Sequence, residues 1–195
     1  MTQFEERWNW CEKNGIRVLQ NPKDFSAAID RLKTIEPKSY LEVGFHRGAS
    51  IYITAGILPK GSKIAGIDLG VHKRNRMLAA NVRGKLLEEG YDVNLIFGNS
   101  TDPTILRQTV IFFERDGLDA VFIDGDHRYA GVKSDYEKFY PLVRSGGFII
   151  FHDVFWEEIP KVWEQAKAKV TNFWEIAFDI KYEGFGMGIG IAQKE

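Results

Sequence analysis

Five short apolar runs, separated by longer segments of helical periodicity, constrain the fold of this chain more than any other feature of its sequence. The runs are rich in Val, Ile, Leu and Phe and span residues 40–43, 63–67, 93–97, 120–123 and 148–151. Strands that are apolar on both faces are typical of a parallel sheet covered by helices. The segments between them, at 49–58, 74–89, 103–115 and 132–143, read as crossover helices. This alternation predicts a doubly wound α/β fold with right-handed crossovers.

The two ends of the chain predict additions to this sheet. Residues 173–180 and 187–192 look extended and are joined by a turn-rich segment at 181–186, which predicts an antiparallel hairpin at one sheet edge. Residues 1–38 read as one or two helices that precede the sheet, with Asp24 as a helix cap. Because the chain has no repeat and no Pro/Gly/Ser-rich linker, we expect a single domain over 1–195, with a helical extension at 1–38 and a core at 39–195.

Composition excludes several classes of protein. The 195 residues are 44% hydrophobic and 27% charged, which is typical of a globular chain and not of a disordered or fibrous one. The net charge of −1 argues against nucleic-acid binding by bulk electrostatics. The single cysteine, Cys11, leaves no internal disulfide and fits a reducing compartment. Without an apolar run of about 20 residues or a signal-peptide pattern, the expected location is the cytoplasm.

The residues that follow the five runs predict where a ligand binds. Ligands of open α/β sheets lie beyond the carboxyl ends of the strands, near the point where the strand order reverses. The segments in question read GFHRG at 44–48, Asp68, GNS at 98–100, DGDH at 124–127 and HD at 152–153. We therefore expect glycine, carboxylate, amide and imidazole groups to converge on one crevice.

The first of these segments is a glycine-containing turn between a strand and a helix. Gly44 and Gly48 allow the backbone to turn sharply and to approach a ligand closely, and the helix N-terminus that follows offers free N–H groups to an anion. His46 and Ala49 stand where a G-x-G-x-x-G motif needs its second and third glycines, which disfavours NAD. A carboxylate at Asp68 can accept hydrogen bonds from both hydroxyls of a ribose. Taken singly, the turn and Asp68 also fit a plain turn and a helix cap.

Three segments together resemble class I S-adenosylmethionine-dependent methyltransferases. They are the E-x-G-x-x-x-G turn at 42–48 with the acidic residue at 68, the D-G-D-H-x-Y-x-G-V-x-x-D pattern at 124–135, and PLVRSGGFII at 141–150. The middle pattern is similar to that of macrolide-sugar and related small-molecule O-methyltransferases. The resemblance covers residues 38–155 and implies a Rossmann-like, three-layer αβα fold with a mostly parallel seven-stranded sheet and an antiparallel edge hairpin.

The resemblance also implies a set of residues that bind S-adenosylmethionine. Glu42, Gly44 and Gly48 would surround its methionine part, and Asp68 would hold the ribose hydroxyls. Asn99 and Ser100 would lie near the adenine, where Asn99 is alternatively a polar loop residue. Asp124 would complete the cofactor-binding set.

Chemistry is expected where two adjacent strands end. Asp124, His152 and Asp153 would meet around a divalent cation, in an arrangement that resembles metal-dependent enzymes such as catechol O-methyltransferase. Mg²⁺ prefers oxygen ligands, whereas an imidazole ligand at His152 favours Mn²⁺, Fe²⁺ or Zn²⁺. His152 could instead leave the cation to the two carboxylates or face the cofactor, and we expect Mg²⁺ or Mn²⁺. Asp124 and His127 are the expected catalytic residues, with His127 as a general base because imidazole titrates near neutral pH. His127 could instead be a metal ligand or a solvated helix start, and the two aspartates could serve only the cofactor and helix caps.

These expectations define a function and its alternatives. The resemblance implies methyl transfer from S-adenosylmethionine to a hydroxyl of a small-molecule acceptor. Two alternatives stay open: an Fe²⁺-dependent hydroxylase-like protein on the same fold, similar to cephalosporin hydroxylases, and a catalytically silent protein that binds S-adenosylmethionine. A nucleic-acid acceptor is not expected, because DGDH stands where an N/D-P-P-Y/F/W motif would be. We expect no membrane association, and similar enzymes suggest a homodimer. Aromatic residues that flank the crevice in sequence, Trp156 among them, could line an acceptor pocket.

Overall fold

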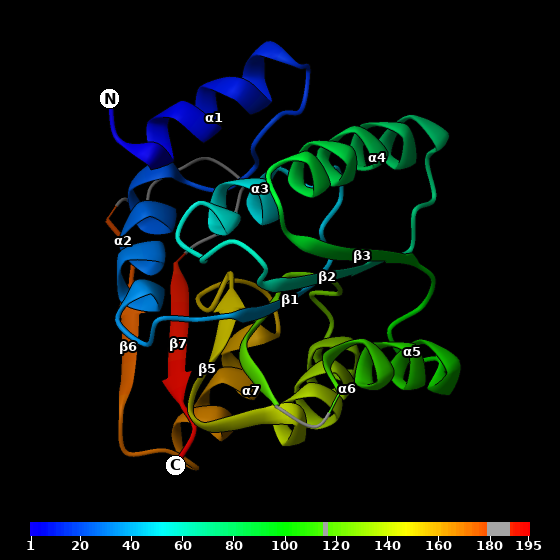
Figure 1. Ribbon diagram of the computed structural model, residues 1–195. Helices are drawn as coiled ribbons and strands as arrows, with labels where there is room; N and C mark the ends of the chain where they lie inside the picture. The colour runs from blue at the N-terminus through cyan, green and yellow to red at the C-terminus, as the bar shows by residue number, and fades with distance from the viewer. Residues whose placement is uncertain (115–116, 179–187) are drawn as a thin grey trace.

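The computed structural model describes residues 1–114, 117–178 and 188–195, and within these ranges the strands form one seven-stranded sheet (Figure 1). The strand order is β3-β2-β1-β4-β5-β7-β6. The strands are β1 (Ser39–Val43), β2 (Lys63–Asp68), β3 (Asp92–Phe97), β4 (Leu118–Ile123), β5 (Val143–His152), β6 (Phe173–Ile176) and β7 (Ile189–Gln193). The first five strands pair in parallel, whereas β7 pairs antiparallel with both β5 and β6. The predicted Rossmann-like fold with an antiparallel edge hairpin is confirmed.

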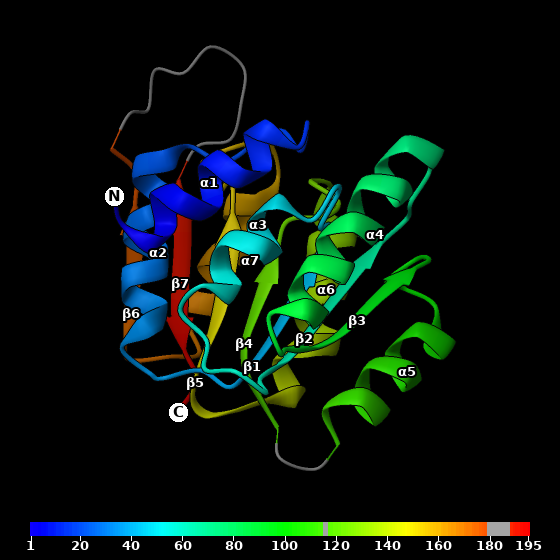
Figure 2. The same ribbon diagram turned by 45° about the horizontal axis from the view of Figure 1, so that its top comes forward.

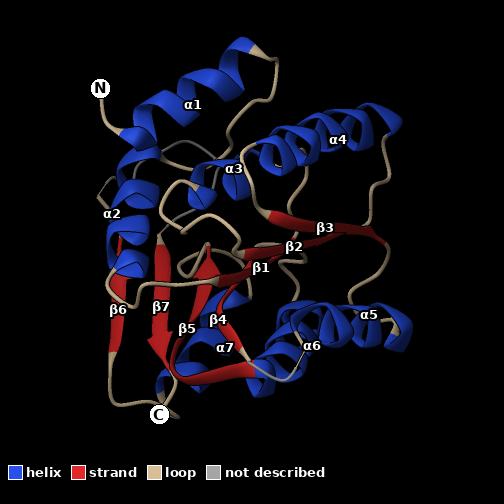
Figure 3. Cartoon of the chain, in the orientation of Figure 1, coloured by secondary structure: helices blue, strands red, loops and turns tan. Residues whose placement is uncertain are grey.

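Helices cover both faces of this sheet and make the expected three layers (Figure 3). They are α1 (Gln3–Lys13), α2 (Pro22–Lys33), α3 (Ala49–Ala55), α4 (Lys73–Glu88), α5 (Pro103–Phe113), α6 (Tyr129–Phe139), a 3₁₀ turn at Tyr140–Leu142, and α7 (Ile159–Lys167). Alternate residues of each central strand enter opposite cores. In β1, Tyr40 packs in the core beneath α1 to α4, and Leu41 packs in the core beneath α5 to α7. Burial on both faces explains why these strands read as continuous apolar runs.

The strand register brings the ends of the central strands to one level. Val43 at the end of β1 pairs with Ile67 of β2 on one side and with Ile123 of β4 on the other. Ile123 in turn pairs with Phe151 of β5. The loops that leave β1, β2, β4 and β5 therefore start side by side.

The amino-terminal segment packs into the same core as the sheet. Figures 1 and 2 both show α2 beside β6 and β7, and Cys11, Phe25 and Leu32 are buried. The expected cap at Asp24 is wrong. The side chain of Asn21 caps α2 by accepting the N–H of Lys23 at 2.9 Å, because Pro22 begins the helix two residues before Asp24.

Two further boundaries differ from the sequence expectations. The predicted helix at 132–143 begins earlier, at Tyr129, and Val143 already belongs to β5 instead of ending that helix. Gly146 and Gly147 look like a turn in the sequence, yet they lie within β5, where the register with β4 shifts. The expected turn at 181–186 and the adjoining parts of its two strands lie outside the described residues, as does position 115 at the end of the predicted helix 103–115.

The described helices include none that is both long enough and apolar enough to cross a membrane.

Candidate active site

A cavity of about 840 Å³ opens at the carboxyl ends of β1 to β5, where the strand order reverses between β1 and β4. Loops from all five strand ends line it, which confirms the predicted convergence. The predicted residues that line the cavity are Gly44, Asp68, Asn99, Ser100, Asp124, His127, His152 and Asp153. Glu42 and Gly48 are not among the lining residues.

The two glycines of the first loop are required by packing between protein segments. A Cβ atom at Gly44 (φ +92°) would lie 2.1 Å from the backbone oxygen of Asp124. A Cβ atom at Gly48 (φ +87°) would lie 3.1 Å from the side chain of Val82 on α4. Gly44 thus allows the ends of β1 and β4 to meet, and Gly48 allows α3 to pack on α4.

Glu42 lies fully buried on β1, beneath the cavity floor. The hydroxyl of Tyr40 donates a hydrogen bond to Glu42 Oε2 at 2.8 Å, and the hydroxyl of Ser50 bonds to Oε1. Burial raises the pKa of Glu42 to about 8, although the bonds from Ser50 and Tyr40 lower it in part. Ser50 lines the cavity, so Glu42 supports the floor through this hydroxyl.

Asp68 stands at the end of β2 with its carboxylate fixed by backbone donors. Its Oδ2 accepts the N–H of His46 at 2.8 Å, and its Oδ1 accepts the N–H of Gly70 at 2.7 Å. An ionised carboxylate has about four acceptor positions, so two remain for a ligand in the cavity. Asn99, by contrast, uses its Oδ1 to accept the N–H of Thr101 at 3.0 Å within its own loop.

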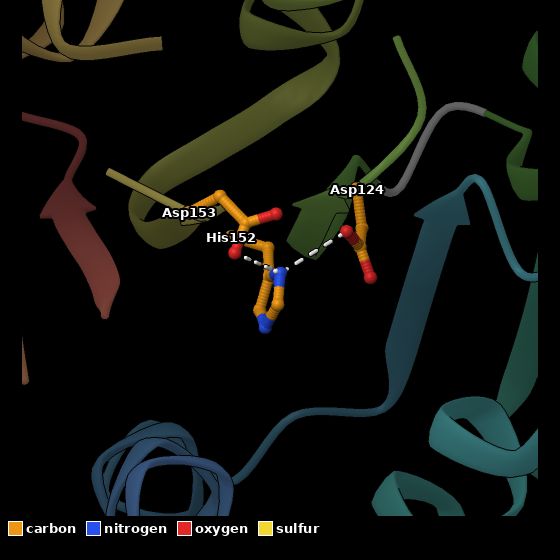
Figure 4. Close-up of side chains that lie close together, drawn as sticks. All are labelled: Asp124, His152 and Asp153. Carbon is orange, nitrogen blue, oxygen red and sulfur yellow. Dashed lines mark ion pairs between the residues drawn. The ribbon is translucent and has the colours of Figure 1, made fainter. Parts of the chain in front are cut away.

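Asp124, His152 and Asp153 form a cluster across the ends of β4 and β5 (Figure 4). The His152 Nδ1 atom lies 2.9 Å from Asp153 Oδ1 and 3.3 Å from Asp124 Oδ1. Burial alone would lower the pKa of His152, but the adjacent carboxylates of Asp124 and Asp153 outweigh it and raise this pKa. Asp153 has a φ of 59°, a left-handed conformation that is strained for a residue with a side chain.

The donor atoms of this cluster suit a divalent cation. One ligand atom from each residue lies within 4.8 Å of the other two. His152 Nδ1 and Asp153 Oδ1 are buried and lie within ion-pair distance of each other, but neither atom has a hydrogen bond of good geometry to any described residue. Buried polar atoms without partners are costly, and coordination of a cation by two carboxylates and an imidazole would satisfy them.

His127 extends the cluster towards the open part of the cavity. Its Nε2 lies 3.3 Å from Asp153 Oδ2, and about a third of its side chain is exposed. The ring of Trp156 lies beside it, with a centroid distance of 4.8 Å. Asp153 therefore contacts both His152 and His127.

One part of the site, which comes from the amino-terminal segment, is not predicted from the sequence. Arg17, Leu19 and Gln20, between α1 and α2, also line the cavity. Gln20 Nε2 donates a hydrogen bond of 3.0 Å to Asp124 Oδ2, from a position 104 residues away in the sequence. No local pattern marks a residue whose role depends on such a distant contact.

The cavity has two halves, one beside Asp68 after β1 to β3 and one beside the Asp124–His152–Asp153 cluster after β4 and β5. The observed strand order is that of the class I methyltransferase fold, as the sequence resemblance predicts. A family model described as a methyltransferase domain matches residues 41–154. The match covers more than half of the chain, which therefore belongs to this family, and the prediction of a methyltransferase is confirmed at that level.

Two curated proteins illustrate how similar the chain is to known sequences. It is 32% identical over 119 residues to an uncharacterized protein of Acanthamoeba polyphaga mimivirus, with 59% of this chain and 51% of the viral protein covered. It is 27% identical over 177 residues to a caffeoyl-CoA O-methyltransferase of Stellaria longipes, with 84% and 70% covered. The chain thus spans about half the length of the viral protein.

Solved structures show the same fold. The O-methyltransferase of Bacillus cereus, in complex with SAH, superposes with a TM-score of 0.73 at 16% identity over 99% of this chain and 90% of that one. An O-methyltransferase of Streptomyces achromogenes involved in tomaymycin synthesis, in complex with SAM, gives a TM-score of 0.69 at 12% identity over 100% and 90%.

Proposed function

We propose that this protein is an S-adenosylmethionine-dependent O-methyltransferase that acts on a hydroxyl of a small molecule with the help of a divalent cation. The observation that carries the proposal is the single cavity that joins Asp68, fixed after β2, to the Asp124–His152–Asp153 cluster after β4 and β5. Relatives named as O-methyltransferases, and the SAH and SAM complexes of structural neighbours, support the same reading.

The first three strand-end loops would hold the cofactor. Asp68 would accept hydrogen bonds from the ribose hydroxyls at its two remaining acceptor positions. Gly44 would lie beside the methionine part, with Glu42 and Gly48 shaping the same loop from beneath. Asn99 and Ser100 would lie along the adenine, and Asp124 would contact both cofactor and acceptor.

The Asp124–His152–Asp153 cluster would hold Mg²⁺ or Mn²⁺, and the nitrogen of His152 favours Mn²⁺. When bound, the cation would supply Lewis-acid chemistry that lowers the pKa of the acceptor hydroxyl. His127 would take the hydroxyl proton on its imidazole while Asp153 orients the ring. Bound S-adenosylmethionine would supply the methyl group: the acceptor oxygen would form the new C–O bond as the C–S bond breaks, with S-adenosylhomocysteine as the leaving group.

The acceptor is proposed to be a small hydroxylated molecule, since 840 Å³ is within the range of small-molecule sites. The net charge of −1 continues to disfavour a nucleic-acid acceptor. Cytoplasmic location and a homodimer remain proposals that fractionation and mass measurement in solution would test.

The first test is a calorimetric titration of S-adenosylhomocysteine into metal-stripped protein, repeated with Asp68→Ala. We expect micromolar binding to the natural protein and its loss in the variant. A panel of hydroxylated acceptors, assayed with Mg²⁺ and with Mn²⁺, then tests the transfer.

Each of the other outcomes supports a different function for this protein. Binding without transfer to any acceptor, unaffected by His127→Ala, indicates a silent cofactor-binding protein. If S-adenosylhomocysteine does not bind, the proposed methyltransferase function is wrong. Turnover with Fe²⁺, a 2-oxoacid and dioxygen would then support the hydroxylase-like alternative.

A further inference from the structure

One guanidinium group at the cavity has no part in the proposed reaction. Arg17 lies between α1 and α2, lines the cavity and is exposed. Among the described residues, the arginines that form salt bridges are Arg7, Arg128 and Arg144, so no described carboxylate neutralises Arg17. A positive charge that borders a ligand cavity and has no protein partner is suited to bind an anionic group of a ligand.

The backbone around Arg17 directs its side chain away from the core. Ile16 and Val18 are buried, whereas Arg17 and Leu19 are exposed and line the cavity. This alternation is typical of an extended segment, in which successive side chains point to opposite sides. The segment therefore presents one cationic and one apolar side chain to the same ligand.

Two contacts hold this segment next to the candidate cation site. The N–H of Val18 donates a hydrogen bond of 3.3 Å to Glu12 Oε1 on α1, and Gln20 Nε2 donates one of 3.0 Å to Asp124 Oδ2. Three residues of extended chain span at most about 11 Å, so the Cα atoms of Arg17 and Gln20 lie within this distance. Arg17 is therefore near enough to contact another part of an acceptor whose hydroxyl lies at the cation site.

The proposed cofactor also has a carboxylate, but this group would lie at a different loop. Its methionine part would bind at the loop after β1, where Arg47 lines the cavity and donates from Nε to Asn75 Oδ1 at 3.0 Å. A second guanidinium is thus present where the cofactor carboxylate would be. The segment with Arg17 instead contacts the end of β4 through Gln20, on the side of the acceptor.

We infer that the methyl acceptor is a hydroxylated acid, and that Arg17 binds its carboxylate or phosphate group while its hydroxyl lies at the cation site. Leu19 would contact the carbon skeleton between these two groups. The inference rests on the proposed function and names the class of its acceptor.

The test compares acids with neutral partners by calorimetric titration into protein saturated with S-adenosylhomocysteine and Mn²⁺. The pairs are 3,4-dihydroxybenzoate with 3,4-dihydroxybenzamide, glucuronate with glucose, and glucose 6-phosphate with glucose. We expect the natural protein to bind the acid of at least one pair about tenfold more tightly than its partner, as for a hydrogen bond between charged groups.

Three variants assign this preference to one side chain. Arg17→Gln should bind the two members of that pair within about twofold of each other, through a loss of affinity for the acid alone. Arg17→Lys keeps the charge but loses the planar fork of donors, so its preference should be intermediate. Arg107→Gln is the matched control, because Arg107 is exposed on α5 outside the cavity, and its preference should equal that of the natural protein.

Three results would overturn the inference. In the first, no acid of the panel binds better than its neutral partner. In the second, Arg17→Gln keeps the preference for the acid, which would then come from the cation or another residue. In the third, Arg17→Gln weakens the binding of S-adenosylhomocysteine as much as that of the acid, which would assign Arg17 to the cofactor carboxylate. Failure of the natural protein to bind S-adenosylhomocysteine is a separate result, which overturns the proposed function itself.

Discussion

At the scale of the single residue, Glu42 ties the stability of the site to pH. Its pKa rises from 4.5 to about 8 on folding, so the folded protein keeps a proton that the unfolded chain loses. The free energy of unfolding should therefore fall between about pH 4.5 and pH 8, by at most about 1.4 kcal/mol per pH unit. Glu42→Gln cannot lose this proton, so it should gain stability over the natural protein as pH rises from 5 to 8.

Urea unfolding of metal-free protein at pH 5 and pH 8 measures this difference. Glu88→Gln, at an exposed position, is the control and should change stability equally at both pH values. A Glu42→Gln difference that stays constant with pH would show that Glu42 is ionised in the folded state.

The proposed role of His127 as a general base can be distinguished by experiment from its two alternatives, a metal ligand and a solvated residue at a helix start. If it is the general base, His127→Ala should lower kcat by about 10² to 10⁴ and leave the Kd values for S-adenosylhomocysteine and Mn²⁺ unchanged. Titration of both ligands, alongside single-turnover rates, provides the measurement. A parallel loss of Mn²⁺ affinity would instead make His127 a metal ligand, and an unchanged rate would make it a solvated helix start.

At the scale of elements, the contact between the ends of β1 and β4 depends on Gly44. A Cβ atom 2.1 Å from the Asp124 backbone oxygen cannot be accommodated unless the two strand ends separate. Gly44→Ala should therefore reduce the free energy of unfolding by about 3 kcal/mol or more. Gly15→Ala is the matched control, since Gly15 also has a positive φ (+70°) but has nothing within 4 Å of its Cβ position. Its conformational cost should be about 1 kcal/mol, and equal costs at both sites would contradict the steric argument.

The segment between α1 and α2 supports the candidate cation site through Gln20. Loss of an outer hydrogen bond to a metal ligand typically weakens metal binding about 10- to 100-fold. Gln20→Ala should therefore weaken Mn²⁺ binding by this order, as measured by calorimetry, because Asp124 Oδ2 loses its donor. Lys23→Ala, at an exposed position of α2, should bind Mn²⁺ like the natural protein. Equal binding by the Gln20 variant would limit Gln20 to a role in packing.

The sequence predicts those elements that are determined by their own residues, and it does not predict those that depend on contacts with distant segments. The central strands are marked by their own apolar residues, and the ligand-facing groups follow from the rule that parallel strands end at one edge. The start of β5 at Val143 could not be predicted from the local sequence, because Gly146 and Gly147 indicate a turn. They lie within a strand because the register between β4 and β5 shifts at this point. The contacts of Gln20 with Asp124 and of Asp24 with the N–H of Phe178 join segments over 100 residues apart, and only the folded structure shows them.

At the scale of the whole molecule, the two halves of the cavity should stabilise the fold independently, because Asp68 after β2 would hold only the cofactor and Asp153 after β5 would hold only the cation, although Asp124 faces both. S-adenosylhomocysteine at 100 times its Kd should add about 2.7 kcal/mol to the free energy of unfolding. Asp68→Ala should abolish this gain and keep the stabilisation by Mn²⁺. Asp153→Asn should do the reverse, and asparagine tolerates the left-handed φ of 59° at this position. Melting curves of the three proteins with each ligand measure both gains. If either variant loses the stabilisation by S-adenosylhomocysteine as well as that by Mn²⁺, the two halves of the cavity form one coupled site. Asp124 would then be the residue that couples them, because it faces both halves.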